Sequence, residues 1–216
     1  LCTAFTDDGG DIDADRQRSL TRALLEVGSQ GFFVCGGTGE GKGMSVPERM
    51  NVAEVVADEV ARQVPIILQV GACSTEDAVE LAQHAKHIDG IDAVASVAPI
   101  DSPNDLDSAV THYRAIGEAT DLPFYVYWLQ GEADKRVTAD LFLDAMGAVP
   151  HFAGIKFTDH NLYLFGQLID QRQLALIGVF AVQHQNRATI CSGFALAHDF
   201  DTRAKGFDDL PPDFSH

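Results

Sequence analysis

The sequence has few basic side chains: 15 lysines and arginines stand against 32 aspartates and glutamates, which gives its 216 residues a formal net charge of −17. A surface of this sign repels nucleic-acid phosphates and anionic lipids, so neither nucleic-acid binding nor a membrane-surface role is expected. No apolar run approaches the roughly 20 residues that a membrane-spanning helix needs. With 46% hydrophobic residues, the composition is that of a soluble globular enzyme.

Cysteine is also scarce and scattered, with no C-x-x-C pair among Cys2, Cys35, Cys73 and Cys191. A disulfide framework is therefore not expected, and free thiols in a reducing cytoplasm fit this usage better. The first residues lack the basic segment and long apolar stretch of a signal peptide. His84 and His87 lie three residues apart on an expected helix, but no carboxylate or thiolate ligand set accompanies them. We therefore expect a cytoplasmic protein without a metal site.

What the sequence does contain is a regular alternation of short β-branched or aromatic runs with longer helical stretches. The runs recur about every 30 residues, the length of a β-α unit in a parallel sheet. The expected strands are Cys2–Thr6, Gly31–Gly36, Pro65–Gly71, Ala93–Pro99, Pro123–Leu129, Phe152–Thr158 and Leu174–Phe180. Ser45, Ser74 and Thr138 precede helical patterns and are expected to cap the N-termini of three helices.

Such alternation is typical of two architectures, a closed barrel and an open doubly wound sheet. No G-x-G-x-x-G motif follows the first expected strand, and seven similar units favour the barrel. We therefore predict an α/β protein whose residues 1–180 form an incomplete TIM (β/α)8-type barrel. Beyond Phe180 the pattern fails and no clear eighth strand follows, so residues 181–216 are expected to form an atypical C-terminal segment.

Reactive groups of a parallel barrel gather where its strands end, and Lys156 lies at such a place. Alternation along the strand points Ile155 and Phe157 one way and Lys156 the other. An interior position is expected, because the helix layer would bury an ammonium group without a partner. Desolvation there lowers the pKa of a lysine and frees its amine to attack a carbonyl. The alternative is a structural lysine that extends to solvent at the strand end.

Two further candidate site features, a tyrosine and a glycine-rich turn, lie at the ends of other expected strands. Tyr127 closes the strand before that of Lys156 at a matching height, where a phenol can move a proton; the alternative is a core aromatic residue. Gly36–Glu40 is a glycine-rich turn whose N–H groups and Thr38 hydroxyl form a small nest, sized for a carboxylate. Lys42 is at the wrong offset for a phosphate-binding loop.

Together these residues resemble the Schiff-base aldolase family of N-acetylneuraminate lyase and dihydrodipicolinate synthase. The family's turn reads G-[ST]-T-G-E, which corresponds to Gly36–Glu40; its tyrosine falls on Tyr127 and its Schiff-base lysine on Lys156. The likeness extends from about Leu1 to Gln171. The stretch Gly154-Ile-Lys-Phe-Thr158 is similar to the N-acetylneuraminate lyase branch.

The resemblance implies reversible cleavage of N-acetylneuraminate, or a similar 2-keto-3-deoxy sugar acid, to N-acetylmannosamine and pyruvate. It implies that Lys156 holds pyruvate as an imine and that Tyr127 moves the proton. The implied substrate-binding residues are Thr38, Gly37, Gly39 and Thr158. It also implies a homo-oligomer, and neither a metal nor an organic cofactor, because the imine itself accepts the electrons.

The sequence departs from the family at several places, and two of them bear directly on the expected site and fold. Gly37 stands where the family has a hydroxyl residue, so one contact to the carboxylate is missing. After about residue 180 the family's two sugar-binding acids, its eighth strand and its helical extension are not evident, so the chain is expected to be truncated or rearranged there. Two alternatives stay open: a dihydrodipicolinate synthase-like condensation of pyruvate, and a catalytically inactive truncated barrel that acts as a binding or regulatory partner.

Overall fold

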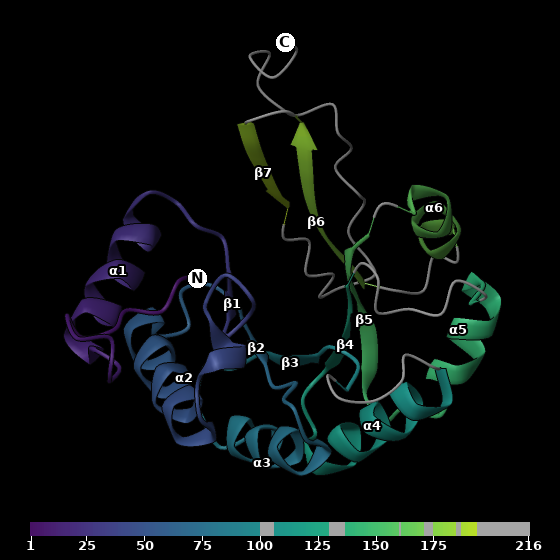
Figure 1. Ribbon diagram of the computed structural model, residues 1–216, viewed down its shortest axis with the longest axis horizontal. Coiled ribbons are helices and arrows are strands. Elements are labelled where there is room, and N and C mark those ends of the chain that lie inside the picture. Colours follow the sequence, from purple (N-terminus) through teal and green to yellow (C-terminus); the bar gives the residue numbers. More distant parts are fainter. Residues whose placement is uncertain (100–105, 130–136, 160, 171–174, 185–186, 194–216) are drawn as a thin grey trace.

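The computed structural model describes residues 1–99, 106–129, 137–159, 161–170, 175–184 and 187–193. They contain one seven-stranded sheet in which each strand lies beside the next one along the chain (Figure 1). The strands are β1 (Phe32–Val34), β2 (Ile66–Gln69), β3 (Ala93–Ser96), β4 (Phe124–Leu129), β5 (Phe152–Thr158), β6 (Ala175–His184) and β7 (Arg187–Gly193). The pairs from β1 to β6 are parallel, and β7 is antiparallel to β6.

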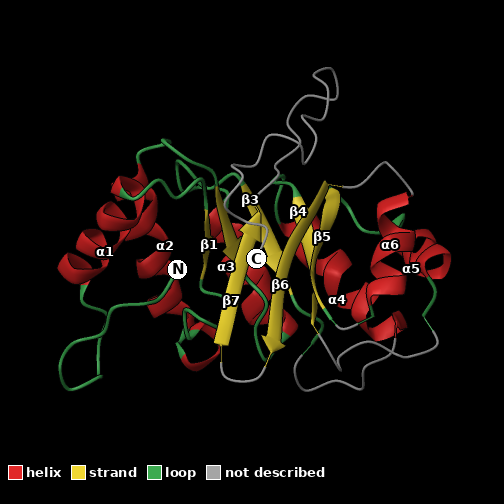
Figure 2. Cartoon of the chain, turned by 90° about the horizontal axis from the view of Figure 1, so that it is seen from above, coloured by secondary structure: helices red, strands yellow, loops and turns green. Residues whose placement is uncertain are grey.

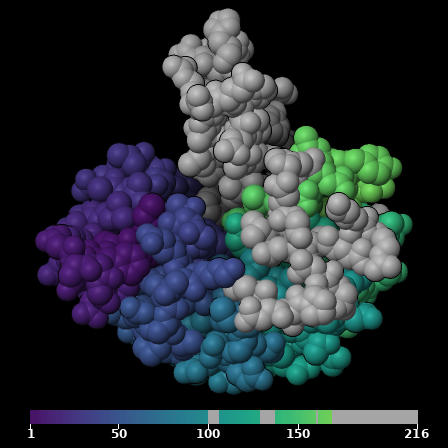
Figure 3. Space-filling view, in the orientation of Figure 1, coloured from purple at the N-terminus to yellow at the C-terminus, as the bar shows by residue number. Residues whose placement is uncertain are grey.

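The helices follow one another around the outside of this curved sheet (Figures 1 and 2). They are α1 (Ala14–Glu26), α2 (Val46–Val60), α3 (Thr75–Ala85), α4 (Leu106–Ala119), α5 (Ala139–Met146) and α6 (Leu162–Asp170), with a 3-10 turn η1 (Gly41–Gly43) before α2. In the space-filling view the colours therefore pass in chain order along the outer rim (Figure 3). This is the arrangement of a (β/α) barrel wall with the helices outside.

The three expected helix caps are present. Ser45 and Glu48 form a complete capping box at the start of α2, and the side chains of Ser74 and Thr138 accept from backbone amides at the starts of α3 and α5. A serine or threonine oxygen satisfies an amide that has no partner inside the helix. These three residues therefore fix where the outer helices begin.

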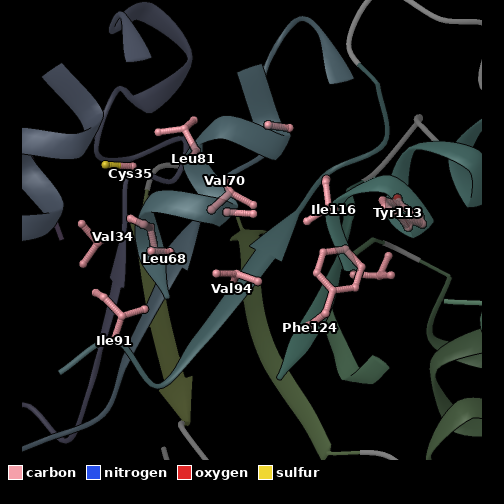
Figure 4. Close-up of a cluster of buried hydrophobic side chains, with 14 of the residues drawn as sticks. Val34, Cys35, Leu68, Val70, Leu81, Ile91, Val94, Tyr113, Ile116 and Phe124 are labelled. Carbon is pink, nitrogen blue, oxygen red and sulfur yellow. The ribbon is translucent and has the colours of Figure 1, made fainter. Parts of the chain in front are cut away.

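Apolar side chains occupy both faces of the sheet, as parallel strands require. The larger cluster lies between the sheet and the helices (Figure 4), and it includes Val34, Leu68, Leu81, Val94, Ile116 and Phe124. The inner face carries a smaller buried cluster: Ile67, Ala93, Ala95 and Tyr125. The two faces are therefore distinct, and any side chain on a strand belongs to one or the other.

The register between β4 and β5 shifts near their beginnings. Phe124 pairs with Phe152, but the next residue, Tyr125, pairs with Gly154, which leaves one extra residue on β5. Because successive side chains alternate between the faces, one extra residue reverses the faces of all residues that follow it. This bulge turns Lys156 toward the inner face, although Phe152 at the start of the same strand packs on the outer cluster.

Six of the expected strands are present, but the one expected at Cys2–Thr6 is wrong. There Phe5 forms an isolated antiparallel bridge with Ile12. The reason is local: the Ala4 amide donates to the Gln17 side chain on α1, and the Ala4 carbonyl accepts from Asp13. These bonds tie the segment to α1, so it does not extend the sheet.

The end of the sheet also differs from the expected pattern. β6 runs to His184, past the expected domain boundary at residue 180, and turns back as β7 where no clear strand was expected. The division into residues 1–180 and 181–216 stays a prediction. Within the described ranges β1 and β7 are not paired with each other, so the barrel is incomplete as expected. None of the helices described is long and apolar enough to cross a membrane.

Candidate active site

Lys156 lies on the inner face of β5, and its backbone partner on β4 is Tyr127. Its side chain is 5% exposed. Its two neighbours, Ile155 and Phe157, belong to the outer cluster, so the strand points them toward the helices. Lys156 therefore has the interior position that was expected, because the bulge and the alternation of β5 turn its side chain to the inner face.

Aromatic rings and one hydroxyl surround the Lys156 amine. Its Nζ lies 3.3 Å from the centroid of the Tyr127 ring and 5.0 Å from that of Phe33. The two rings meet edge to face, with centroids 5.6 Å apart and an interplanar angle of 82°. Nζ also donates to Thr158 Oγ1 at 3.4 Å. Among the described residues no carboxylate pairs with this amine, so its charge has no anionic partner.

Burial lowers the pKa of Lys156 from 10.5 to about 7. Water stabilises an ammonium group far better than apolar side chains do, so removal of water favours the neutral amine. A pKa near 7 leaves a large fraction of the amine unprotonated at neutral pH. An unprotonated, buried amine in a concave sheet is able to attack a carbonyl carbon.

The turn Gly36–Glu40 follows β1 and uses part of its own N–H groups. The amides of Gly39 and Gly41 donate to the carbonyl of Gly36, and that of Glu40 donates to Gly37. No backbone acceptor among the described residues takes the amides of Gly37 and Thr38. The expected nest is thus reduced to these two amides and the exposed Thr38 hydroxyl, while the Gly39 amide would have to leave Gly36 to bind a ligand.

Packing explains some glycines of this turn but not Gly37. A Cβ on Gly41 would lie 1.9 Å from the Cys35 carbonyl oxygen, and one on Gly39 would lie 2.7 Å from the Leu1 carbonyl oxygen. At Gly37 a Cβ would meet no atom within 4 Å. The turn could therefore carry a side chain at position 37. This departure from the family removes a hydroxyl group, and the packing of the turn does not require it.

The structure brings Lys156, Tyr127 and Thr158 into contact, whereas Thr38, Gly37 and Gly39 lie in the separate turn. Phe33 connects the two groups, and it was missed in the sequence. Its ring reaches the amine on one side and packs against Gly36 on the other, where a Cβ would lie 2.8 Å from it. Because Phe32 and Phe33 are both apolar, nothing in the sequence distinguishes the ring that faces the site from the one that faces the helices.

A second set of buried polar groups lies around the ends of β2 and β3. His112 on α4 contacts Thr75 Oγ1 through Nδ1 at 2.8 Å and Ser96 Oγ through Nε2 at 3.1 Å. Ser96 donates its own proton to the Val97 carbonyl, so Nε2 must be the donor and Nδ1 the acceptor of a neutral imidazole. Burial lowers the pKa of His112 to about 4, which keeps the ring neutral.

Among the described residues Arg49 on α2 is a second buried cation, with 3% exposure. Its guanidinium group donates to the carbonyl of Gly71 at 2.9 Å and to the carbonyl of Gln69. These bonds join α2 to the end of β2. Neither here nor elsewhere in the described part of the chain do three or more histidine, cysteine or carboxylate side chains gather as metal ligands would.

Known proteins resemble the chain in sequence and in fold. A profile described as "Dihydrodipicolinate synthetase family" matches residues 1–181. An uncharacterized DapA-like lyase of Halobacterium salinarum is 35% identical over 170 residues, which cover 79% of this chain and 55% of the relative. N-acetylneuraminate lyase of Mus musculus is 36% identical over 177 residues, which cover 79% of this chain and 54% of the relative.

A solved structure, Proteus mirabilis N-acetylneuraminate lyase, superimposes with a TM-score of 0.76 at 28% identity, covering 82% of this chain and 61% of that one. The chain thus spans about half the length of the curated relatives it matches. The matched part includes the strands that carry the turn, the tyrosine and the lysine.

Proposed function

The chain belongs to the dihydrodipicolinate synthetase family, and from this premise we propose that it is a class I aldolase with Lys156 as its Schiff-base residue. Aldolases of this family use a lysine imine and no metal cofactor. The observation that carries the proposal is the buried Lys156 amine, which pairs with no carboxylate among the described residues and whose pKa is lowered to about 7. A structural lysine would instead be expected to keep its charge and a carboxylate or solvent around it.

The proposed reaction begins when the neutral amine attacks the C2 keto group of the substrate. The oxygen of that group leaves as water and an imine forms between C2 and Nζ. The C3–C4 bond then breaks, its electron pair moves toward the imine nitrogen, and the C4 hydroxyl gives up its proton as the aldehyde forms. The enamine takes a proton at C3, and water hydrolyses the imine to release pyruvate. Tyr127 is the proposed carrier of the proton that leaves the C4 hydroxyl.

The proposed site also has a place for the substrate carboxylate. The amides of Gly37 and Thr38 have no backbone acceptor among the described residues, and the Thr38 hydroxyl is exposed beside them. Such a pair of adjacent amides suits an anion. Gly39 completes the turn, and Thr158 lies against the amine at 3.4 Å, next to where the substrate would be held.

The proposed substrate is N-acetylneuraminate or a similar 2-keto-3-deoxy sugar acid, cleaved to pyruvate and N-acetylmannosamine. The similarity to the mouse and Proteus mirabilis lyases supports this choice. The family description favours a second candidate, condensation of pyruvate with an aldehyde in the manner of dihydrodipicolinate synthase. Two incubations distinguish the candidate reactions. A lyase should release pyruvate from N-acetylneuraminate, whereas a synthase should form a condensation product from pyruvate and aspartate semialdehyde.

Borohydride trapping tests the proposed chemistry directly. Incubation with pyruvate and borohydride should add one reduced pyruvyl group, and peptide mass spectrometry should locate it on Lys156. The Lys156→Ala variant should gain no such mass and should release no pyruvate from N-acetylneuraminate. Wild-type protein that unfolds cooperatively, yet keeps an unmodified Lys156, would contradict the proposal and favour the inactive barrel with a binding or regulatory role.

Three accompanying proposals concern the setting of the enzyme. Its partners are the sugar acid and pyruvate, and it forms homo-oligomers, which light scattering would detect. The strongly acidic surface argues against nucleic-acid and membrane partners. A cytoplasmic location is supported by the cysteine usage, since Cys2, Cys35 and Cys73 are free thiols in the described residues.

A further inference from the structure

We propose that Phe33 is a positioning residue of the candidate active site: its ring orients Tyr127 and closes the apolar enclosure around the Lys156 amine on the side of the glycine turn. The inference rests on the proposed function, because it assigns a role in the same site. It concerns the environment of the amine, however, and that environment can be measured whether or not the protein accepts pyruvate.

The first argument is the position of the Phe33 ring across the inner face. Phe33 lies on β1 and Tyr127 on β4, yet their ring centroids are 5.6 Å apart at an angle of 82°. The edge of one aromatic ring therefore meets the face of the other, which is a preferred geometry for such pairs. This contact limits the rotation of the Tyr127 ring, whose face lies 3.3 Å from the Lys156 Nζ.

The second argument is that Phe33 is itself held in place by Gly36. A Cβ on Gly36 would lie 2.8 Å and 2.9 Å from two carbon atoms of the Phe33 ring. Only a glycine leaves room for the ring there, and its φ angle is not in the left-handed region, so the backbone does not require glycine. The turn proposed to bind the carboxylate thus sets the position of the ring that faces the amine.

Two opposing effects of the ring act on the Lys156 amine. The face of an aromatic ring attracts an ammonium group, which favours the charged form. A ring that excludes water favours the neutral form. Burial lowers the pKa of Lys156 to about 7, and we expect the exclusion of water by the Phe33 ring to be the larger of its two effects. Removal of the Phe33 ring should therefore raise this pKa.

The other groups that surround the Lys156 amine offer few alternative causes for a change of its pKa. From β4 it is faced by Tyr127 and, deeper in the inner cluster, by Tyr125, whose pKa is raised by burial so that it stays neutral. On β6 its backbone partner is Ile177. The first acid after β5 is Asp159, whose carboxylate accepts a hydrogen bond from the Trp128 indole at 3.2 Å.

The test compares two adjacent phenylalanines on opposite faces of β1. Phe33→Ala and Phe33→Leu alter the inner face, while Phe32→Leu alters the outer cluster, where Phe32 is 4% exposed. Reductive methylation with ¹³C-formaldehyde labels the five lysines of the chain, and NMR then gives the pKa of each amine. Lys156→Arg identifies the signal. The pH dependence of borohydride trapping with pyruvate is measured on the same proteins.

Phe33→Ala should raise the pKa of Lys156 by about one unit or more, Phe33→Leu by less, and Phe32→Leu not at all. Trapping by the Phe33 variants should slow at neutral pH and recover at alkaline pH, because more of the amine is then neutral. If Phe33→Ala and Phe32→Leu give the same pKa, the proposal is wrong. If wild type shows a lowered pKa that Phe33→Ala raises, but no variant traps pyruvate, the proposed function fails while this inference stands.

Gly36→Ala provides a second test that keeps Phe33 and does not depend on the folding of Phe33→Ala. The new methyl group should displace the ring and shift the pKa of Lys156 in the same direction. In a Phe33→Ala background Gly36→Ala should add nothing, since the ring is already gone. Additive shifts would show that Gly36 acts independently of Phe33 and would overturn the connection between turn and amine.

Discussion

Two buried cations, an arginine and a lysine, lie in the described part of the chain, and they differ in what surrounds them. Arg49 is 3% exposed and Lys156 is 5% exposed. The Arg49 guanidinium group donates to two backbone carbonyls through its two terminal nitrogens. The Lys156 amine has two aromatic rings and one hydroxyl at 3.4 Å. Burial is the same for both, whereas hydrogen bonding is not.

The difference shows how a buried cation can be either structural or reactive. An arginine keeps its proton at any ordinary pH and suits a position where two carbonyls must be joined. A lysine can release its proton when its surroundings do not stabilise the charge. The carbonyl-bound cation on the outer face therefore holds the wall together, and the poorly solvated one on the inner face is available for chemistry.

Lys156→Met should have the largest effect, because it removes the proposed nucleophile. Pyruvate release should fall by at least about a thousandfold, since no other group can form the imine. The same variant should be more stable than wild type at neutral or lower pH. A lowering of the pKa from 10.5 to about 7 corresponds to at most about 5 kcal/mol of cost in the protonated state.

The sign of this stability effect can be checked against pH. The unfolded lysine keeps its proton up to about pH 10.5, whereas the folded one releases it near 7. Between these values the unfolded state binds more protons, so wild-type stability rises with pH. The advantage of Lys156→Met, measured by urea unfolding, should therefore shrink from pH 7 to pH 10.5. A variant that is less stable than wild type at pH 7 would place Lys156 with the structural cations.

Arg49→Met should give the opposite result. It removes the Arg49 donor from the buried carbonyls of Gln69 and Gly71, and Gly71 keeps only the 3.5 Å hydrogen bond from Gln69 Nε2. The change should cost about 2–4 kcal/mol of unfolding free energy. The loss should not change between pH 6 and pH 10, because the guanidinium group does not titrate there. Urea unfolding of both methionine variants side by side gives the comparison. An effect of Arg49→Met that varies with pH as strongly as that of Lys156→Met would contradict the distinction drawn between the two cations.

The outer face was more predictable from the sequence than the inner one. The strand Phe152–Thr158, which carries Lys156, and the helix caps Ser45, Ser74 and Thr138 were identified correctly, because apolar runs and capping residues are local signals. The expected strand at Cys2–Thr6 was wrong, because its backbone bonds go to α1, a contact that no local pattern encodes. The bulge in β5 was not foreseen for the same reason.

For the candidate site, the sequence indicated which residue types lie at the strand ends, but it did not indicate all the side-chain contacts between different strands. Lys156 and Tyr127 were expected at matching height, and they are backbone partners. Phe33 was not singled out, because its contact with the Lys156 amine on β5 comes from β1, four strands away in the order of the sheet. Curvature of the sheet brings these strands together, and curvature cannot be read from strand patterns.

His112 provides a test of whether a second buried, hydrogen-bonded side chain is structural, as Arg49 is. The folded ring resists protonation down to a pKa of about 4, while an unfolded histidine binds a proton near 6.5. The unfolded state therefore holds the extra proton between these values, and stability should fall by up to about 3 kcal/mol as pH drops through this window. His112→Gln should flatten that pH dependence in urea unfolding.

The matched control for this effect is His87→Gln, because His87 is exposed on the surface. It should leave the acid sensitivity as it is in wild type. His112→Gln should also reduce stability at pH 7, since Thr75 and Ser96 lose the imidazole that joins them. An unchanged slope between pH 6.5 and pH 4 in His112→Gln would show that the buried ring is not the acid-sensitive group.

The smallest expected effect is that of Gly37→Ser in the turn beside the amine. A Cβ at position 37 meets no atom within 4 Å, so the unfolding free energy should change by less than about 0.5 kcal/mol. By contrast, Gly41→Ala should prevent folding, because its Cβ would lie 1.9 Å from the Cys35 carbonyl oxygen. The comparison separates a glycine that packing requires from one that it does not.

The serine hydroxyl at position 37 should strengthen pyruvate binding, because it adds a donor beside the amides of Gly37 and Thr38. One added hydrogen bond is worth about 1 kcal/mol, so half-maximal borohydride trapping should need about fivefold less pyruvate. Gly37→Ala is the control, since it adds the same Cβ without the hydroxyl. If alanine and serine at this position trap pyruvate equally well, the turn does not hold the carboxylate, and the inner-face lysine must orient its substrate by other groups.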